Sequence, residues 1–354
     1  MDIAKIDKRF DLTETVLDKS FDYYSLPNEN FNLLGVFRDE KEGFIRLPQS
    51  IANQVSSGVA HLNHDTSGGR LRFKTDSKAF KIIVEYDYIW PMQHMTLVGS
   101  SGFILLEIKN GKREYVKILP PTFNDKTGYT TEINLKGDGL REYILYFPLY
   151  GRVRNLTIGL TKNAKVLPAK YKDILPIVYY GSSITQGGCA SRPDSSYQAM
   201  IEKKNDIDFI NLGFSGNGKG ETIMANYIAS IKASLYVIDF NNTVISLEEL
   251  KERHFPLYKT IRDKNPDTPI LILTKTNGIK DNDNLDREKI IKSTYLNAKK
   301  LGDNNIYFLS GHSLISMENA QHFLVDSDHP TDLGFYFMAN RIYKKMCAID
   351  KKFK

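Results

Sequence analysis

Three side chains of the kind that hydrolases use for nucleophilic catalysis stand at two places in this sequence. Ser183 follows an apolar stretch that ends at Gly181, and Asp326 precedes His329 by three residues in a segment rich in turn formers. An aspartate at this spacing can accept a hydrogen bond from the imidazole Nδ1 and leave Nε2 directed at a nucleophile. Each residue alone is common in turns without any catalytic role. Together they predict a Ser-His-Asp triad that attacks an ester carbonyl.

Two further segments offer donors for the negative charge that such an attack places on the carbonyl oxygen. Gly216 follows an apolar segment, and its amide is not shielded by a side chain. Asn241 and Asn242 follow the next apolar segment, and either side-chain amide can donate a hydrogen bond there. With the Ser183 amide, these groups predict an oxyanion hole in which the register of the two asparagines stays open.

The elements that must position these residues alternate between strand and helix. We expect five buried strands, over residues 175–180, 209–212, 235–240, 269–274 and 306–309. Helices are expected between them, among them 247–264, 285–301 and 331–346. This alternation predicts an α/β fold with a doubly wound parallel sheet, whose site lies at the carboxyl ends of the strands. The candidate residues would then meet at one edge of the sheet.

The first half of the chain shows short alternating strands and almost no helical period. Asn110-Gly111 separates two of these strands and is a strong signal for a tight hairpin, and the pattern repeats around Gly137-Asp138-Gly139. Many short strands with regular turns predict a β-sandwich or jelly roll. The periodicity is lost over residues 162–170. We therefore predict an accessory domain over 1–168 and a catalytic domain over 169–354.

Composition excludes several classes of protein. The 354 residues are 41% hydrophobic and 25% charged, which excludes a disordered or fibrous chain. The 48 basic and 42 acidic residues are interleaved without a basic stripe, so we expect no nucleic-acid partner. The longest apolar runs are far below the roughly 20 residues that span a bilayer. The first nine residues lack the apolar core of a secretory signal, and we expect a cytoplasmic protein without a membrane partner.

A phosphate-binding loop is a rival interpretation of one segment. Residues 213–219 match Gly-x-x-x-x-Gly-Lys after an expected strand, which is the start of a nucleotide-binding P-loop. The motif requires Ser or Thr after the lysine to bind the metal, and Gly220 stands there. The nucleotide-binding alternative also leaves the triad residues unexplained.

A carbohydrate-binding protein with a weakly active hydrolase fold is the other alternative. Its sugar-stacking rim would be formed by aromatic residues of the first half, namely Tyr86, Tyr88, Trp90 and His94. His61 and His64 have no thiolate nearby and are expected in a surface turn rather than a metal site. We expect neither a metal nor a cofactor.

The candidate motifs resemble those of the SGNH (GDSL-type) hydrolases. Gly181-Ser182-Ser183-Ile184-Thr185 is similar to block I of that family, Gly216 to its block II glycine, and Asp326-x-x-His329-Pro330 to its block V. One of the two adjacent asparagines matches the block III asparagine. Segments 183–193 and 329–335 are similar to a subfamily with an N-terminal β-sandwich and a Gly-x-Asp-Leu-Tyr signature. Gly102-Phe103-Ile104-Leu105-Leu106 resembles that signature.

The resemblance implies a flavodoxin-like SGNH fold and a serine esterase that removes small acyl groups, above all O-acetyl groups, from carbohydrates. It implies Ser183 as nucleophile, His329 as base and Asp326 as the group that orients it. It favours Asn242 over Asn241, because the oxyanion asparagine usually lies a few residues beyond the acidic end of its strand. The implied partner is a small-molecule or oligosaccharide acyl ester, and homo-oligomer formation is left open.

Two departures from the family pattern stand out. Ser182 occupies the place of the aspartate that gives the family its GDSL name, and we expect little catalytic cost. Ile104 and Leu106 replace the aspartate and tyrosine of the sandwich signature, which argues against a ligand role for that segment.

Overall fold

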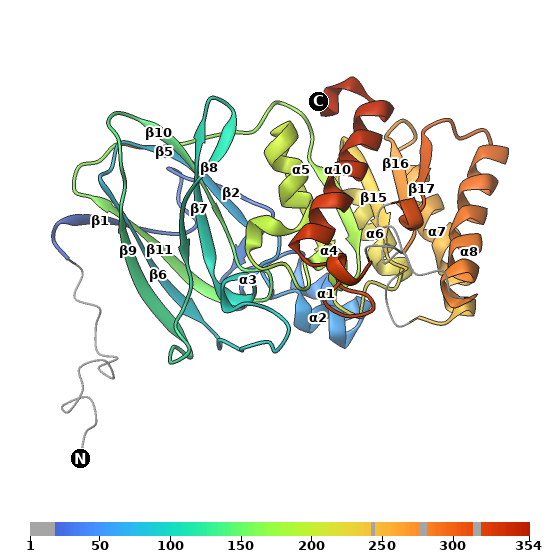
Figure 1. Ribbon diagram of the computed structural model, residues 1–354, viewed down its shortest axis with the longest axis horizontal. Coiled ribbons are helices and arrows are strands. Elements are labelled where there is room, and N and C mark those ends of the chain that lie inside the picture. The colour runs from blue at the N-terminus through green and yellow to red at the C-terminus, as the bar shows by residue number, and fades with distance from the viewer. Residues whose placement is uncertain (1–17, 242–244, 276–281, 314–319) are drawn as a thin grey trace, which may run out of the picture.

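The computed structural model describes residues 18–241, 245–275, 282–313 and 320–354. Figure 1 shows two layers of antiparallel strands beside a parallel sheet that is flanked by helices. Within the described residues, no helix is long and apolar enough to cross a membrane. The predicted cytoplasmic location stays a prediction.

The second half of the chain forms the predicted doubly wound parallel sheet. Its strands lie in the order β14 (Phe209–Gly213), β13 (Ile177–Gly181), β15 (Leu235–Asp239), β16 (Ile270–Leu273) and β17 (Ile306–Leu309). All neighbouring pairs are parallel. The order 2-1-3-4-5 is that of flavodoxin-like sheets, and the direction of strand succession reverses at β13. The carboxyl ends of β13, β14 and β15 therefore lie next to one another.

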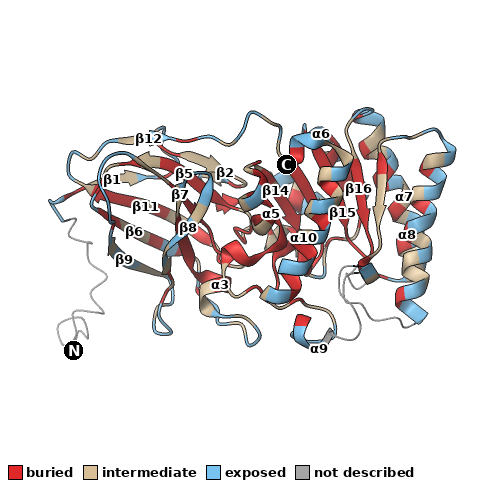
Figure 2. Cartoon of the chain, turned by 45° about the horizontal axis from the view of Figure 1, so that its top comes forward, coloured by how far each residue is buried: buried red, intermediate tan, exposed pale blue. Residues whose placement is uncertain are grey.

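Helices cover both faces of this sheet. They are α4 (Ser183–Gln186), α5 (Tyr197–Asn205), α6 (Thr222–Ser230), α7 (Leu247–Lys264), α8 (Asn282–Lys300), α9 (Ala320–Phe323) and α10 (Asp332–Ile349). Helix α7 has the predicted bounds, and Ser246 and Glu249 form a capping box at its start. Figure 2 shows that the sheet strands are buried, whereas α8 turns an exposed face outward.

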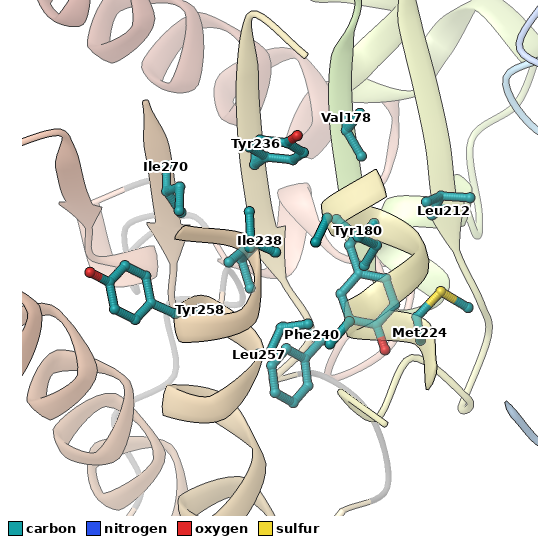
Figure 3. Close-up of a cluster of buried hydrophobic side chains, with 14 of the residues drawn as sticks. Val178, Tyr180, Leu212, Met224, Tyr236, Ile238, Phe240, Leu257, Tyr258 and Ile270 are labelled. Atoms are coloured by element: carbon teal, nitrogen blue, oxygen red, sulfur yellow. The ribbon is translucent and has the colours of Figure 1, made fainter. Parts of the chain in front are cut away.

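Side chains from alternate positions of the strands form the core under α6 and α7. Figure 3 shows Val178, Tyr180, Tyr236 and Ile238 of the sheet facing Met224 of α6. Their burial removes large apolar side chains from water, at roughly 1.5–3 kcal/mol for each fully buried aliphatic side chain. The same packing fixes where the carboxyl ends of the strands lie.

The first half forms the predicted β-sandwich. One sheet contains β1 (Phe21–Ser25), β11 (Val153–Thr161), β6 (Ala79–Tyr86) and β9 (Gly128–Asn134). The other, here called the inner sheet, contains β12 (Val166–Pro168), β5 (Arg70–Thr75), β10 (Arg141–Tyr146), β7 (Phe103–Lys109) and β8 (Lys112–Leu119), with β2 (Asn32–Leu34) paired to β5. A two-stranded ribbon of β3 (Phe37–Asp39) and β4 (Gly43–Ile45) and a short helix α3 (Leu97–Ser101) complete it.

One of the two predicted hairpins is present. Asn110 and Gly111 connect β7 to β8 with positive φ angles of 51° and 74°, as a type I′ turn requires. The segment around Gly137-Asp138-Gly139 does not close a hairpin. It carries the chain from β9 in one sheet to β10 in the other, so the prediction of local pairing is wrong there. Turn residues alone do not distinguish a hairpin from a crossing between sheets.

The central strands of the inner sheet, β5, β10 and β7, are buried on both faces over most of their length. Phe103 and Leu105 belong to the sandwich core, while Ile104 and Leu106 belong to a buried cluster that also contains residues of the parallel sheet and of α10. Ile104 is 0% and Leu106 3% exposed. The two residues that depart from the sandwich signature therefore act as packing between the two halves of the molecule.

Besides α3, two short helices in the first half are absent from the sequence prediction. They are α1 (Gln49–Val55) and α2 (Ser57–Leu62), and Leu47, Ala52 and Val59 join the core beneath β13 and α6. Neither helix is long enough to show a helical period. The division at residue 168 remains a proposal, and these helices pack on the half that lies beyond it.

Candidate active site

The three predicted triad residues lie together at the carboxyl edge of the parallel sheet. The Ser183 Oγ lies 2.8 Å from His329 Nε2, and His329 Nδ1 lies 2.8 Å from Asp326 Oδ2. Ser183 begins α4 directly after β13, and His329 lies between α9 and α10. The arrangement is a continuous chain of hydrogen bonds from a hydroxyl through an imidazole to a carboxylate.

Local capping places the serine at the site. Ser182 is the N-cap of α4, and its hydroxyl accepts a hydrogen bond of 3.3 Å from the Ile184 amide. A serine can serve as N-cap as well as an aspartate can, which explains why this departure from the family motif is tolerated. Ser183 thereby occupies the first helical position, where the amide has no partner within the helix.

Asp326 is held in its charged form. Partial burial raises its pKa, but the amides of Asp328 and His329 donate to Oδ1 at 2.7 Å each, and the His329 ring contacts Oδ2. The hydrogen bonds outweigh the burial, so the pKa of Asp326 lies below its usual 3.8. An ionised Asp326 fixes the imidazole with its proton on Nδ1 and leaves Nε2 free to accept the serine proton.

Two of the predicted oxyanion donors have free amides. The amides of Ser183 and Gly216 donate to no acceptor within the described residues. Gly216 is exposed and has a φ of +65°, a conformation that L side chains rarely adopt. Glycine at this turn therefore permits both the backbone conformation and an unobstructed N–H.

Only one of the two candidate asparagines of the predicted oxyanion hole lies within the described residues. Asn242, the preferred residue, lies outside the described residues. Asn241, the alternative, lies two residues beyond the end of β15 and is 2% exposed, and neither polar atom of its side chain has a partner in the described part of the chain.

Sequence reasoning missed a polar chain that joins the Gly216 turn to the sandwich half. Gln186 Oε1 accepts from the Ser215 amide at 2.9 Å, and Gln186 Nε2 donates to Asp65 Oδ2 at 2.8 Å. Arg46 is buried and donates to the carbonyl oxygen of Gly213 at 2.5 Å, at the end of β14. The Gln186–Ser215 contact joins positions 29 residues apart, and the contacts of Asp65 and Arg46 join positions 121 and 167 residues apart, so no local pattern predicts them. They fix the turn that presents the Gly216 amide.

Burial dominates the titration of the Asp65 carboxyl. Asp65 is 4% exposed, and desolvation raises its pKa to about 7 against the opposing effects of Arg46 and of the Gln186 hydrogen bond. Its nearest ion-pair partner is Arg152, whose Nε lies 3.9 Å from Oδ1.

A cavity of about 600 Å³ adjoins the triad on the histidine side, and every residue that lines it belongs to the first half of the chain. The rings of His94, on its wall, and His329 have centroids 6.2 Å apart. Tyr150, also on the wall, donates or accepts a 2.7 Å hydrogen bond with Ser215 Oγ. A Cβ on Gly188 would lie within 3.3 Å of Tyr150 Oη, the Ser183 carbonyl and His329 Cδ2, so these atoms surround one point.

Three of the four residues of the aromatic rim proposed from the sequence line the cavity, and the fourth does not. Tyr88, Trp90 and His94 line the cavity, and the first two are 41% and 70% exposed. Tyr86 belongs to the sandwich core, is 4% exposed and donates to the Ser101 carbonyl at 2.6 Å. Side chains of a strand alternate between its two faces, and Tyr86 lies on the face of β6 that is buried in the sandwich.

The surface turn predicted for the two histidines of the first half holds only His64, whereas His61 is exposed at the end of a helix. His61 lies in α2 and lines the cavity, and His64 Nε2 lies 2.8 Å from Glu42 Oε2. In the described ranges, no group of three or more His, Cys, Asp and Glu side chains is arranged to hold a metal ion.

The P-loop-like segment does not form a phosphate cradle. The amides of Asn217 and Gly218 both donate to the carbonyl of Phe214, at 2.9 and 3.0 Å. Phosphate binding in such a loop requires backbone N–H groups that point at the ligand. The segment serves instead as the turn that carries Gly216.

Two family models match this chain over most of its length. Residues 175–347 match the GDSL-like lipase/acylhydrolase family, and residues 21–166 match the N-terminus of SGNH-hydrolase-type esterases. The chain therefore belongs to the GDSL-like (SGNH) hydrolases that carry this N-terminal domain. It is a carboxylic ester hydrolase.

Solved structures share this two-part architecture. A protein described as a GDSL-like lipase from Bacteroides ovatus has 27% identity and a TM-score of 0.80, with 93% of this chain and 98% of that one covered. The salicylyl-acyltransferase SsfX3 of a tetracycline biosynthetic pathway has 18% identity and a TM-score of 0.78, with 94% and 98% covered. The acetyl xylan esterase Est2A from Butyrivibrio proteoclasticus has 13% identity and a TM-score of 0.60, with 94% and 100% covered. A comparison with curated proteins found no match.

Proposed function

We propose that this protein hydrolyses small acyl esters, above all O-acetyl esters, of carbohydrates through a Ser183–His329–Asp326 triad. The observation that carries the proposal is the continuous hydrogen-bonded chain from Ser183 Oγ to Asp326, with both links at 2.8 Å. Nucleophile, base and orienting group thus already stand at the separations that general-base catalysis requires.

In the proposed mechanism, Ser183 Oγ attacks the ester carbonyl while its proton passes to His329 Nε2. The amides of Ser183 and Gly216, with the side chain of Asn242 or Asn241, donate to the oxygen that becomes negative. His329 then gives its proton to the departing alcohol, and an acyl-enzyme forms on Ser183. Water, deprotonated by His329, hydrolyses this ester and restores the free hydroxyl. Asp326 stabilises the positive imidazolium in both steps.

Two observations support a carbohydrate ester as the substrate. Est2A, which shares the overall fold, is an acetyl xylan esterase. The cavity beside His329 combines exposed aromatic rings with charged side chains. This combination suits a ligand with both apolar faces and hydroxyl groups.

The experiment is acetate release from a panel of acetylated xylo-, manno- and chito-oligosaccharides by the purified protein and by Ser183→Ala. We expect release from at least one member of the panel, and a loss of on the order of 10⁶-fold in the variant. Wild-type activity in Ser183→Ala would contradict the mechanism. Hydrolysis of lipid esters alone would contradict the substrate class.

A further inference from the structure

The direction of proton transfer defines where the alcohol part of the ester must lie. In the acylation step, the imidazole Nε2 gives its proton to the departing oxygen, so the acyl acceptor occupies the histidine side of the triad. The cavity that adjoins His329 through His94 and Tyr150 lies on this side. Its volume of about 600 Å³ is within the range of about 300–1,000 Å³ that is typical of small-ligand pockets.

The cavity wall carries hydrogen-bonding groups that only a polar ligand can satisfy. Asp65 is a buried carboxylate whose Oδ1 has Arg152 as its nearest cation, at a distance of 3.9 Å. The Arg152 guanidinium lies 5.4 Å from the centre of the Tyr88 ring, and its side chain is 15% exposed. An alkyl chain in this cavity would remove water from the Asp65 carboxyl group and the Arg152 guanidinium without replacing its hydrogen bonds, which is costly. Vicinal hydroxyls can donate to the carboxylate and accept from the guanidinium.

The rim of the cavity offers a flat apolar surface. Trp90 is 70% exposed, and Tyr88 stands edge-on to it with ring centroids 6.1 Å apart. Large exposed aromatic rings beside a cavity are typical of ligand sites rather than of ordinary surface. The C–H face of a pyranose ring can pack against such a ring while its hydroxyls reach the polar wall.

We infer that this cavity is the acceptor subsite of the enzyme, in which the sandwich half binds the pyranoside ring that carries the ester. Trp90 stacks on the ring, and Asp65 and Arg152 bind its hydroxyls. This inference rests on the proposed esterase function and adds that specificity for the alcohol is supplied by the first half of the chain. The second half then recognises only the acyl group.

The chain has a single tryptophan, and it stands at this rim. Its fluorescence is therefore a direct probe of the cavity. The binding experiment titrates Ser183→Ala protein, which cannot turn the ligand over, with acetylated xylobiose and with acetylated mannobiose while tryptophan is excited selectively. We expect a saturable change with at least one of them and none with hexyl acetate. Saturation by hexyl acetate alone would overturn the subsite.

A kinetic comparison tests the same residues during turnover. The quantity measured is kcat/KM for the acetylated disaccharide divided by kcat/KM for 4-nitrophenyl acetate. Trp90→Ala is expected to lower this ratio by about tenfold, mainly through KM, as loss of one aromatic contact would. Arg152→Gln should lower it as well. Tyr115→Ala, an aromatic residue on β8 that is 56% exposed and does not line the cavity, is the matched control.

The binding and hydrolysis experiments together distinguish a wrong subsite from a wrong esterase function. If the wild type hydrolyses the acetylated disaccharides while tryptophan fluorescence and the Trp90→Ala ratio stay unchanged, the subsite is wrong and the esterase stands. If the disaccharide changes the fluorescence but no ester is hydrolysed, the proposed esterase is wrong and the sugar pocket stands.

Discussion

The charge of Asp326 is the residue-scale property on which the proposed mechanism depends. Its hydrogen bonds keep the pKa below the usual 3.8, so the charged form is present above that pH and is lost only as the pH falls through the lowered value. Although its side chain is 49% exposed, the amide donors at Oδ1 keep it in place.

The first prediction concerns this carboxylate. Asp326→Asn should lower kcat by up to about 10⁴-fold, because an amide no longer stabilises the imidazolium or selects its tautomer. The measurement is kcat on a simple acetate ester near neutral pH. Asp328→Asn is the matched control two residues away, where the carboxylate forms an ion pair with Lys275 at 2.8 Å. Equal losses in both variants would argue against a specific role for Asp326.

The second prediction decides between the two asparagines after β15. Loss of an oxyanion donor costs on the order of 10²–10³-fold in kcat, with little change in KM. We expect this loss for Asn242→Ala and a much smaller one for Asn241→Ala. The reverse order would assign the donor to Asn241, and normal kcat in both would remove asparagine from the proposed hole.

At the scale of elements, the sequence predicts the triad residues and the strands that carry them. It does not predict the side-chain contacts that hold the Gly216 turn or the short helices of the first half. The apolar strands and the motifs around Ser183 and His329 are local in sequence, so the parallel sheet and the candidate residues follow from spacing. The bond between Asp65 and Gln186 joins positions 121 residues apart and leaves no periodic trace. Helices α1 and α2 are too short to be recognised, and they owe their stability to packing, of α1 on α6 and of α2 on α1.

The third prediction tests the support of the Gly216 turn. Gln186→Ala leaves the Ser215 amide and the Asp65 carboxyl without their partner, which should lower the free energy of unfolding by about 1–3 kcal/mol. It should also lower kcat more than it changes KM, because the oxyanion amide loses its position. Gln54→Ala, at an exposed site on α1, is the control. A stability loss with unchanged kcat would limit Gln186 to a structural role.

The fourth prediction concerns the carboxyl at the end of β15. Burial raises the pKa of Asp239 to about 7, despite hydrogen bonds from Thr185 and Tyr197. A group with a raised pKa favours the folded state fully below its unfolded value of 3.8, and this contribution is lost as the pH rises through about 7.

Asp239→Asn removes this titration. The free energy of unfolding of the wild type, relative to that of the variant, should therefore fall between about pH 4 and pH 7. Denaturant titrations across this range measure it, with Asp263→Asn, on the exposed surface of α7, as the control for charge. A difference that does not change with pH would contradict the raised pKa.

At the scale of the whole molecule, the two halves share their cores. Leu47, Ala52 and Val59 enter the core of the parallel sheet from one side, and the outer face of the inner sheet enters it from the other. Charged contacts reinforce the boundary, among them the buried Arg113 with Glu202 and Asp206, and Arg70 with Asp208. Two of the buried clusters thus contain residues of both halves.

The fifth prediction follows from this shared interior. Unfolding by denaturant should be one cooperative transition, with the fluorescence of Trp90 in the sandwich half and the far-UV circular dichroism of the helices changing together. An earlier fluorescence transition, while the helical signal persists, would show that the sandwich unfolds independently.

The burial of β7 on both faces also limits how this protein can recombine with its relatives. Exchanging residues 21–166 for the matching domain of another esterase would bring a foreign set of side chains to the face that Ile104 and Leu106 now fill. Interiors are packed so densely that such a mismatch leaves either voids or overlaps. Because the same domain lines the cavity beside His329, a new specificity cannot be gained by attaching a new sandwich unless both surfaces change together.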